Sequence, residues 1–476
     1  MTGYDAIVVG AGPNGLAAAI TLQREGLSVL LIEAKDTIGG GLRSAEITRP
    51  GFIHDCCSSV YPLAVNSPFF DSISLEDYGT GFVYSPAFLA HAFSDGTALL
   101  LYQSLADTIN QLGDDGVIYR NEIKPLLEAW NSISHAFLGP LTMKAELFKT
   151  FNFSIQAIRS AISFSKKFNT EACKALWAGL AAHSMLPLHK TASNAFALMM
   201  ALTGHRNGWP IAKGGAQKIA DALCVYFCSL GGKIETGKRI DSLRQLSPAK
   251  AVLFDVTPKQ LLNLAGDKFS PLYKYQLNRY KYGMGVFKID WALSQPIPYL
   301  NKNCLLSATV HLGNSLQEIT AGEHNAWKGK TSDTPFVIIT QPSLFDKRAP
   351  GDAHTAWAYC HVPNGYNGSM TSIIEKQIEQ VAPGFRDCII ERYESNPETL
   401  EAYNANYIGG DINGGRQDIT QLFTRPAMRL SPYKTSAKGI YICSSSTPPG
   451  GGVHGLCGYY AARSALVREF GINMGS

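Results

Sequence analysis

Three glycines near the start of the chain, Gly10, Gly12 and Gly15, have the spacing of a turn that binds a dinucleotide. In this spacing the first glycine allows a tight turn, the second lets the backbone approach a pyrophosphate, and the third lets a helix pack closely on a strand. The helix would offer free N–H groups and its positive dipole end to the phosphates. Glu33, 18 residues after Gly15, is placed to accept hydrogen bonds from the ribose hydroxyls of an adenosine. Because this acid would repel a 2′-phosphate, the pattern favours a dinucleotide without one.

The elements around these residues form a strand, helix and strand in succession. Residues 6–9 are an apolar run that leads into the glycine turn, and residues 16–25 are rich in helix formers. Gly26 stands where a helix commonly ends, and residues 28–33 have the composition of a buried parallel strand. The sequence therefore predicts a βαβ unit of the Rossmann-like, α/β kind.

The rest of the chain changes character twice. Residues 104–202 are dominated by helix formers, which predicts a helical insert. Alternation then returns. We expect strands at 233–235, 251–256, 280–290, 335–341 and 439–443, and helices at 216–230, 370–382 and 458–470.

The composition excludes several classes of protein. The net charge is +4, only 17% of residues are charged, and 45% are hydrophobic, so neither disorder nor a nucleic-acid partner is indicated. Ten scattered cysteines without a C-x-x-C motif predict reduced thiols in a cytoplasmic protein, and we expect no signal peptide or transmembrane segment. No histidine or cysteine spacing suggests a metal, and no nucleophilic serine motif is present.

Glycine is in excess, at 45 of 476 residues, where a usual share of about 7% would give roughly 33. The surplus lies in clusters at 39–41, 214–215, 409–415 and 450–452. Such clusters allow the backbone to approach a ligand closely. We assign the cluster at 409–415 to no function.

Several of these segments resemble one large family. The residues Gly-Gly-Gly-Leu-Arg-Ser at 39–44, and those at 214–240, 283–291, 407–415 and 439–455, are similar to FAD-dependent oxidoreductases related to phytoene desaturases. The similarity extends to the branch that includes pyridine nucleotide-disulphide oxidoreductase domain-containing protein 2. The family histidine of the last segment is Pro448 here, and a usual proline is His454. His454 is expected either to face the substrate or to cap the next helix.

The resemblance implies FAD as the cofactor and an FAD-binding domain assembled from residues 1–70, 206–270 and 426–476. Residues 71–205 and 271–425 would form an α+β substrate domain with a mixed sheet and the helical insert. In the family the arginine of the second turn approaches the flavin, so Arg43, with His454 and Tyr459, is a weak catalytic candidate. The implied cofactor-binding residues are Gly10, Gly12, Pro13, Asn14, Gly15, Glu33, Ala34, Gly40, Gly41, Leu42, Arg43, Ile240, Ser446, Gly451, Gly452 and Val453.

The reaction implied is hydride transfer from a C–H bond of an apolar, lipid- or isoprenoid-like substrate to the flavin. A second complete nucleotide motif is absent from the sequence, so we expect an electron acceptor other than a stably bound nicotinamide. Two alternatives stay open: a flavin amine oxidase, and a non-catalytic protein of the same fold that binds prenyl groups or lipids. Ile155, Ile158, Ile162 and Phe168 are expected near one helical face, which suits either a membrane surface or ordinary core packing.

Overall fold

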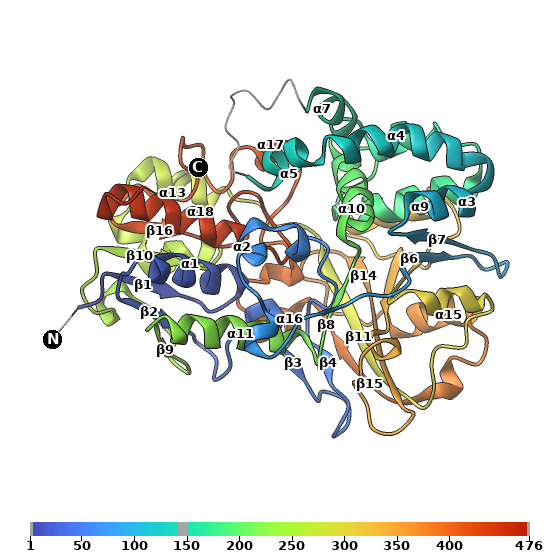
Figure 1. Ribbon diagram of the computed structural model, residues 1–476, viewed down its shortest axis with the longest axis horizontal. Helices are drawn as coiled ribbons and strands as arrows, with labels where there is room; N and C mark the ends of the chain where they lie inside the picture. Colours follow the sequence, from blue (N-terminus) through green and yellow to red (C-terminus); the bar gives the residue numbers. More distant parts are fainter. Residues whose placement is uncertain (1–2, 140–149, 474–476) are drawn as a thin grey trace.

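Five parallel strands form the sheet at the left of the molecule (Figure 1). The computed structural model describes residues 3–139 and 150–473. The strands lie in the order β16 (Ile440–Ile442), β10 (Ala251–Phe254), β1 (Ala6–Val9), β2 (Val29–Ile32) and β9 (Lys233–Glu235). They come from three separated stretches of the chain. The turn after β1 leads directly into α1 (Pro13–Arg24), as the glycine spacing predicts.

Both faces of this sheet are covered, which explains why its inner strands β1, β2 and β10 are apolar, whereas the edge strand β9 carries Lys233 and Glu235. Ala6 and Val8 point into a core shared with α1, α11 (Ala216–Ser229) and α18 (Leu456–Ala465). Ile7 and Val9 point into a second core with α12 (Pro258–Ala265) and α13 (Pro271–Asn278). The helices cover the two faces of the sheet and leave the carboxyl ends of its strands uncovered.

Seven strands form a second, mixed sheet at the right of Figure 1. Their order is β15 (Ile389–Ser395), β11 (Gly285–Leu293), β14 (His354–Val362), β13 (Val337–Thr340), β12 (Thr309–Leu312), β6 (Ala87–Ala92) and β7 (Ala98–Tyr102). Only the β12–β6 pair is parallel. Helix α15 (Thr371–Val381) packs on one face through Ile374 and Ile378.

The other face of the mixed sheet carries the helical insert, whose described helices gather at the upper right of Figure 1. They are α3 (Leu105–Gln111), α4 (Gly116–Glu128), α5 (Trp130–Leu138), α7 (Phe151–Ala157), α8 (Ala161–Ser165), α9 (Glu171–Ala182) and α10 (Ser193–Asn207). Phe164 and Trp177 stack in this core, with ring centroids 4.6 Å apart. The predicted fold class, a Rossmann-like α/β domain with a mixed-sheet domain and a helical insert, is confirmed.

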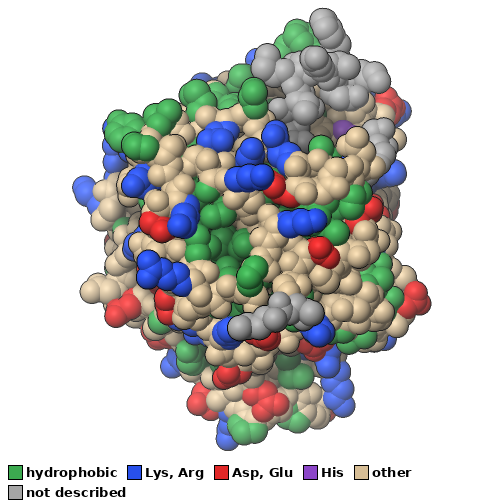
Figure 2. All heavy atoms as spheres, turned by 90° about the vertical axis from the view of Figure 1, so that its left-hand side faces the viewer, with side chains coloured by type: hydrophobic (Ala, Val, Ile, Leu, Met, Phe, Trp, Pro, Cys, Tyr) green, Lys and Arg blue, Asp and Glu red, His purple; other side chains and the backbone are tan. Residues whose placement is uncertain are grey.

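The other described α-helices and strands lie outside these two sheets and the insert. They are α2 (Pro68–Asp71), α14 (Leu316–Trp327), α16 (Pro397–Tyr403), α17 (Ile419–Leu422), β3 (Ser44–Ala45), β4 (His54–Asp55), β5 (Phe82–Val83) and β8 (Ile211–Ala212). On the face shown in Figure 2, lysine and arginine side chains are interspersed with hydrophobic and acidic ones. Within the described ranges, every helix is too short or too polar to cross a membrane. The domain boundaries at residues 70, 205, 270 and 425 stay a prediction.

The expected single helical face is not formed. Helix α7 ends at Ala157, so Ile155 and Ile162 lie on different elements, and the burial of Phe168 agrees with the core-packing alternative. From residue 150 to 168 the large exposed apolar side chains are Phe151, Ile155 and Ile158, at 63%, 48% and 55%. They belong to α7 and the residue after it.

Candidate active site

A cavity of about 490 Å³ lies between the carboxyl ends of the parallel strands and one face of the mixed sheet. Such a crevice is where open α/β sheets bind ligands. Its glycine half is lined by Gly10, Gly12, Pro13, Asn14, Glu33, Ala34, Gly40, Gly41, Arg43, Ile240, Asp255, Gly451, Gly452, Val453 and His454. Its apolar half is lined by Phe137, Leu138, His183, Met185, Phe196, Met199, Met200, Trp209, Thr309, Ile338, Thr340, Trp357 and Tyr359.

The turn after β1 brings bare backbone to the cavity. Gly10 has φ +101°, and its N–H donates to the carbonyl of Ile32 on the neighbouring strand β2 at 2.7 Å. A Cβ on Gly15 would lie 1.9 Å from the Gly10 carbonyl oxygen, so only glycine lets the helix start this close to the strand. Pro13 occupies the first helical turn, and the Gly12 cap has no side chain to cover the free N–H groups.

Glu33 lies at the end of β2 with its carboxylate already bonded. Oε2 accepts from the Ala11 N–H at 2.8 Å, and Oε1 accepts from the Lys35 N–H at 3.0 Å. The side chain is buried yet lines the cavity. Strand β9 lies beside β2 in the sheet and places Ile240 at the same end, because the Lys238 N–H donates to the Glu33 carbonyl at 2.9 Å.

Arg43 lies with Glu33 at this end of the cavity. Its Nη2 donates to Glu33 Oε1 at 3.2 Å and to the Thr37 carbonyl at 2.8 Å. The guanidinium also lies over the Tyr403 ring, 5.6 Å from its centroid. Arg43 therefore holds the carboxylate that is expected to bind the ribose. These contacts do not favour the position beside the flavin that the resemblance implies.

His454 caps a helix. Its Nδ1 accepts from the Leu456 N–H at 3.0 Å, at the start of α18, and its Nε2 lies 3.2 Å from the Gly450 carbonyl. Burial lowers the pKa of His454 to about 4, so the imidazole is neutral and donates from Nε2. With both ring nitrogens paired, the capping alternative is favoured over a role in proton transfer.

Four residues of the sequence-based assignment do not line the cavity. Tyr459 packs against Phe69 and Tyr460, with ring centroids 6.5 Å and 5.2 Å away, so its packing does not favour a catalytic role. Ser446 is fully buried and donates to the Gly414 carbonyl at 2.7 Å. The remaining two, Gly15 and Leu42, act through packing.

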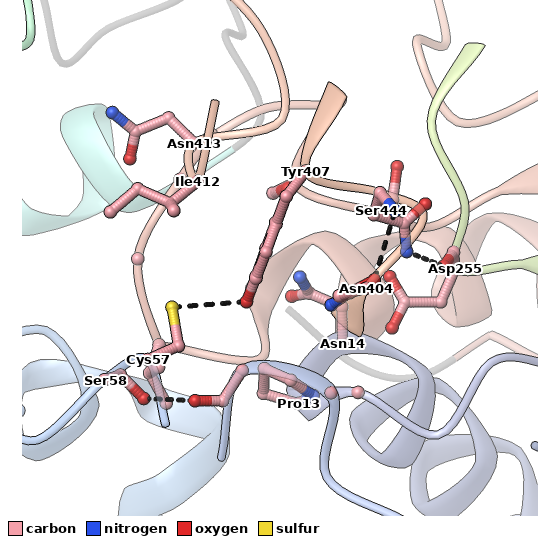
Figure 3. A pocket seen from close by; sticks show the side chains of 18 of the residues that line it. Pro13, Asn14, Cys57, Ser58, Asp255, Asn404, Tyr407, Ile412, Asn413 and Ser444 are labelled. Atoms are coloured by element: carbon pink, nitrogen blue, oxygen red, sulfur yellow. Dashed lines mark hydrogen bonds between the residues drawn. The ribbon is translucent and has the colours of Figure 1, made fainter. Parts of the chain in front are cut away.

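The glycine cluster at 409–415 packs beside residues 444–446, which follow β16. A Cβ on Gly414 would lie 2.3 Å from the Ser445 hydroxyl, and one on Gly415 would lie 2.0 Å from the Tyr280 hydroxyl. The neighbouring Ile412 and Asn413 side chains line the cavity (Figure 3). These glycines thus let residues 409–415 pack closely against residues 444–446.

Asp255 is a site residue that the sequence reading missed. It follows β10 at the carboxyl edge of the sheet, where polar residues after buried strands meet ligands, and this placement was a usable signal. Its Oδ2 accepts from the Gly15 N–H at 3.0 Å, at the start of α1. Burial, and to a smaller extent the charge of Glu33, raise the pKa of Asp255 to about 7 against the lowering effect of the Gly15 bond.

The apolar half combines side chains from helices and strands far apart in sequence. Met185, Met199 and Met200 offer flexible, polarisable walls. Trp357 and Tyr359 stack with ring centroids 5.7 Å apart, and the Trp357 indole donates to the Ser59 hydroxyl at 2.7 Å. This half suits an apolar ligand.

Cys57 lies where the two halves meet (Figure 3). The Tyr407 hydroxyl donates to its sulfur at 3.3 Å. Burial raises the pKa of Cys57, and it raises the pKa of Cys56 to about 11. Both thiols are free and protonated at neutral pH, which does not suit thiol–disulfide exchange. Within the described residues, no group of acids, histidines and cysteines could hold a metal ion.

The glycine half fits a dinucleotide. A Cβ on Gly40 would lie 3.0 Å from the Gly12 Cα, so two glycine turns form a narrow backbone cradle. The buried Asn14 side chain has no hydrogen-bond partner for its Oδ1 among the described residues, and it lines the same cradle. Bare N–H groups, an acid and an unpaired amide oxygen are the groups that phosphates and ribose hydroxyls require.

Comparisons with known proteins agree with this geometry. The family model described as an NAD(P)-binding Rossmann-like domain matches residues 8–72. The chain is 26% identical to pyridine nucleotide-disulfide oxidoreductase domain-containing protein 2 of Rattus norvegicus, over 96% of this chain and 92% of that protein. It is 23% identical to a neurosporene-forming phytoene desaturase of Rhodobacter capsulatus, over 95% and 92%.

A solved structure extends the likeness to the fold. Cyclohexylamine oxidase from Brevibacterium oxydans has a TM-score of 0.62 at 13% identity, covering 99% of this chain and 100% of that one. The predicted resemblance is confirmed, and with it the predicted class of oxidoreductase and its cofactor.

Proposed function

We propose that this FAD-dependent oxidoreductase, a relative of the phytoene desaturases, dehydrogenates an apolar, lipid- or isoprenoid-like substrate at a C–H bond. When bound, FAD supplies the acceptor for the hydride. The chain's own residues bind and orient both molecules and keep water out. The observation that carries this proposal is the single cavity with a glycine half and an apolar half.

In this proposal the glycine half holds the cofactor. The two glycine turns and the start of α1 bind the pyrophosphate through N–H groups, and Glu33, fixed by Arg43, accepts from the adenosine ribose. Ile240 lies beside the adenosine, and Gly451, Gly452 and Val453 offer backbone N–H groups at the opposite end. Pro13, Asn14, Ala34, Gly40 and Gly41 complete the cradle.

The test is anaerobic mixing of the FAD-loaded protein with three panels: apolar polyenes, fatty acids and amines. We expect the flavin absorbance to bleach with an apolar compound and to stay unchanged with amines. Bleaching by amines alone would overturn the proposal. A protein that retains no flavin would instead favour a lipid-binding role without catalysis.

Amine oxidation is the second candidate, because an amine oxidase shares the fold. The charges in the cavity favour it less. Among the described lining residues the acids are Glu33, Asp241 and Asp255, and all three lie toward the glycine half. An ammonium group in the apolar half would therefore lack a counter-charge, and burying it unpaired is costly.

We also propose that the protein is cytoplasmic and touches membranes through α7. The free thiols support a reducing compartment. Phe151, Ile155 and Ile158 are exposed and have the spacing of residues on one face of a helix. Replacing these three with serine should abolish flotation with vesicles that contain anionic lipid. The matched control replaces Leu272 and Tyr275, exposed by 67% and 57% on α13, and should float as the wild type does. Wild-type protein that stays at the bottom of the gradient would refute this contact.

A further inference from the structure

Two threonine hydroxyls in the apolar half have no partner. Thr309 is 3% exposed and Thr340 is fully buried, both line the cavity, and neither Oγ1 has a hydrogen-bond partner among the described residues. Leaving a buried hydroxyl unpaired costs free energy, so valine, which has the same shape, would be the more stable residue at either position. Two such hydroxyls in one cavity indicate a ligand that pairs with them.

The sheet register places these hydroxyls on the same face. Thr309 of β12 lies opposite Thr340 of β13, and Thr340 lies opposite Trp357 of β14. Residues directly opposite in antiparallel strands project to one side of the sheet. Two positions along, the next row is His311, Ile338 and Tyr359. This face therefore carries a polar row inside an otherwise apolar cavity.

A third polar group, His183, is held beside these rows by a chain of histidines. His183 Nε2 lies 3.0 Å from His311 Nε2, and His311 lies opposite His91 in the parallel β12–β6 pair. His91 Nε2 lies 2.7 Å from the Gly313 carbonyl. Burial lowers the pKa of His91 to about 4 and of His183 to about 3, and lowers that of His311 as well, so all three rings are neutral.

The carbonyl at the end of the chain sets the direction of its hydrogen bonds. His91 must donate from Nε2 to Gly313, which leaves its Nδ1 without a proton. The Nδ1 atoms of His91 and His311 face the same point: a Cβ on Gly179 would lie 3.2 Å and 2.8 Å from them. Neither Nδ1 has a hydrogen-bond partner among the described residues, and we infer a proton on His311 Nδ1, which keeps two lone pairs from facing each other. In this assignment His183 donates from Nε2, and its own Nδ1 is an acceptor.

This acceptor belongs to a residue of the cavity wall. His183 lines the cavity, and no hydrogen bond joins its Nδ1 to the described residues. A carbonyl or ether oxygen could accept from the threonines but would leave His183 unpaired. An ammonium would lack an acid. A hydroxyl group can donate to His183 and accept from a threonine.

We propose that the apolar half ends in a hydroxyl-binding site formed by Thr309, Thr340 and His183, and that the substrate is an apolar chain bearing an alcohol group. This inference rests on the proposed function, because it takes the apolar half as the place of the substrate. The histidines behind His183 act as positioning residues that keep its acceptor atom turned to the cavity.

The experiment compares two isomers, 1-octanol and 1-methoxyheptane, by calorimetric titration of the FAD-loaded protein. They have the same atoms, but only the alcohol can donate. We expect the alcohol to bind about tenfold more tightly. Equal affinities would overturn the hydroxyl site while leaving an apolar cavity in place. No binding of either isomer would count against the proposed function itself.

Variants locate the site. Thr309→Val and Thr340→Val should each reduce the preference for the alcohol severalfold without lowering the melting temperature, since an unpaired hydroxyl is removed. Thr320→Val is the matched control, because its hydroxyl is also buried and unpaired but lies outside the cavity. His183→Phe should weaken binding of the alcohol and not of the ether. An unchanged preference in all of the cavity variants would refute the assignment.

Discussion

The two halves of the cavity satisfy their polar groups in different ways. In the glycine half the charged side chains are already bonded within the protein, Glu33 to three donors and Asp255 to the start of α1, and the Asn14 Oδ1 is the atom left without a partner among its described residues. In the apolar half Thr309 and Thr340 are left without partners. The first half is built before a ligand arrives and binds largely through backbone, whereas the second leaves side-chain groups for the ligand to satisfy.

This difference implies different tolerance to substitution. A backbone cradle depends on glycines that no other residue can replace, so changes there should damage folding and cofactor binding together. A pocket of side chains on a sheet should tolerate isosteric changes and lose only selectivity.

The largest effect is expected at Gly15. In Gly15→Ala the new Cβ would lie 1.9 Å from the Gly10 carbonyl oxygen, a clash between backbone atoms that cannot rotate away. We expect a loss of about 3 kcal/mol or more in the free energy of unfolding, and no retained flavin. Denaturant unfolding and the visible spectrum measure both.

The control for this clash is Gly26→Ala. Gly26 has a positive φ, +78°, but no atom lies within 4 Å of its Cβ position, whereas Gly15 lies inside α1 and is close-packed. Its cost should be about 1 kcal/mol, with flavin retained. Similar losses for the two variants would show that close packing of α1 does not govern the glycine half.

Glu33→Gln tests the acid of the glycine half. The amide keeps the shape but loses the charge that the Arg43 guanidinium and two N–H groups bind. Hydrogen bonds to charged groups contribute about 1.5–3 kcal/mol, so FAD affinity should fall about 10-fold to 100-fold. The exposed Glu46→Gln is the control and should bind FAD as the wild type does. Unchanged affinity in Glu33→Gln would remove its ribose role.

Asp255→Asn tests the carboxyl at the start of α1. The pKa of Asp255 is raised to about 7, so its carboxylate forms as the pH rises past neutrality, beside the N–H groups expected to bind phosphate. FAD affinity of the wild type should fall about tenfold between pH 7 and 8.5, and that of the variant should stay flat. A parallel decline in both proteins would exclude Asp255 as the cause.

The same carboxyl affects stability without the cofactor. Because its pKa is higher in the folded protein than the usual 3.8, the folded state binds the proton more tightly. Its contribution therefore weakens as the pH rises from about 4 to 7. Thermal unfolding of the flavin-free protein should show a smaller decline over this window in Asp255→Asn.

The smallest effect is expected at His454. His454→Ala removes the acceptor for the Leu456 N–H and should cost about 1 kcal/mol, whereas His454→Asn keeps an acceptor and should cost less. Since burial holds the pKa of His454 near 4, flavin reduction between pH 5 and 8 should not follow its titration. A pH dependence near 6.5 that disappears in both variants would restore a catalytic role.

The sequence predicts the glycine half far better than the apolar half. Gly10, Gly12 and Glu33 lie within one βαβ unit, so their spacing alone places them together. Arg43 lines the cavity as expected, but its contacts with Glu33 and Thr37 could not be read from the sequence, nor could the packing of Tyr459 on Phe69 away from the cavity.

The apolar half was not predictable because strand register brings it together. Thr309, Thr340 and Trp357 are separated by at least 17 residues and meet only through the β12–β13–β14 pairing. His183 reaches the same wall from the end of a helix. No local pattern marks these positions, whereas Asp255 directly follows a buried strand and could have been found.

The most direct test of the central claim is the rate of flavin reduction by an apolar polyene, without oxygen, in the wild type and in Met200→Lys. Met200 lines the apolar half and is 8% exposed, so the variant places a charge where the substrate is expected to lie. We predict that the polyene bleaches the wild-type flavin and fails to bleach the variant, while photochemical reduction of both proceeds equally. Bleaching of the variant at the wild-type rate would contradict the assignment of the apolar half to the substrate.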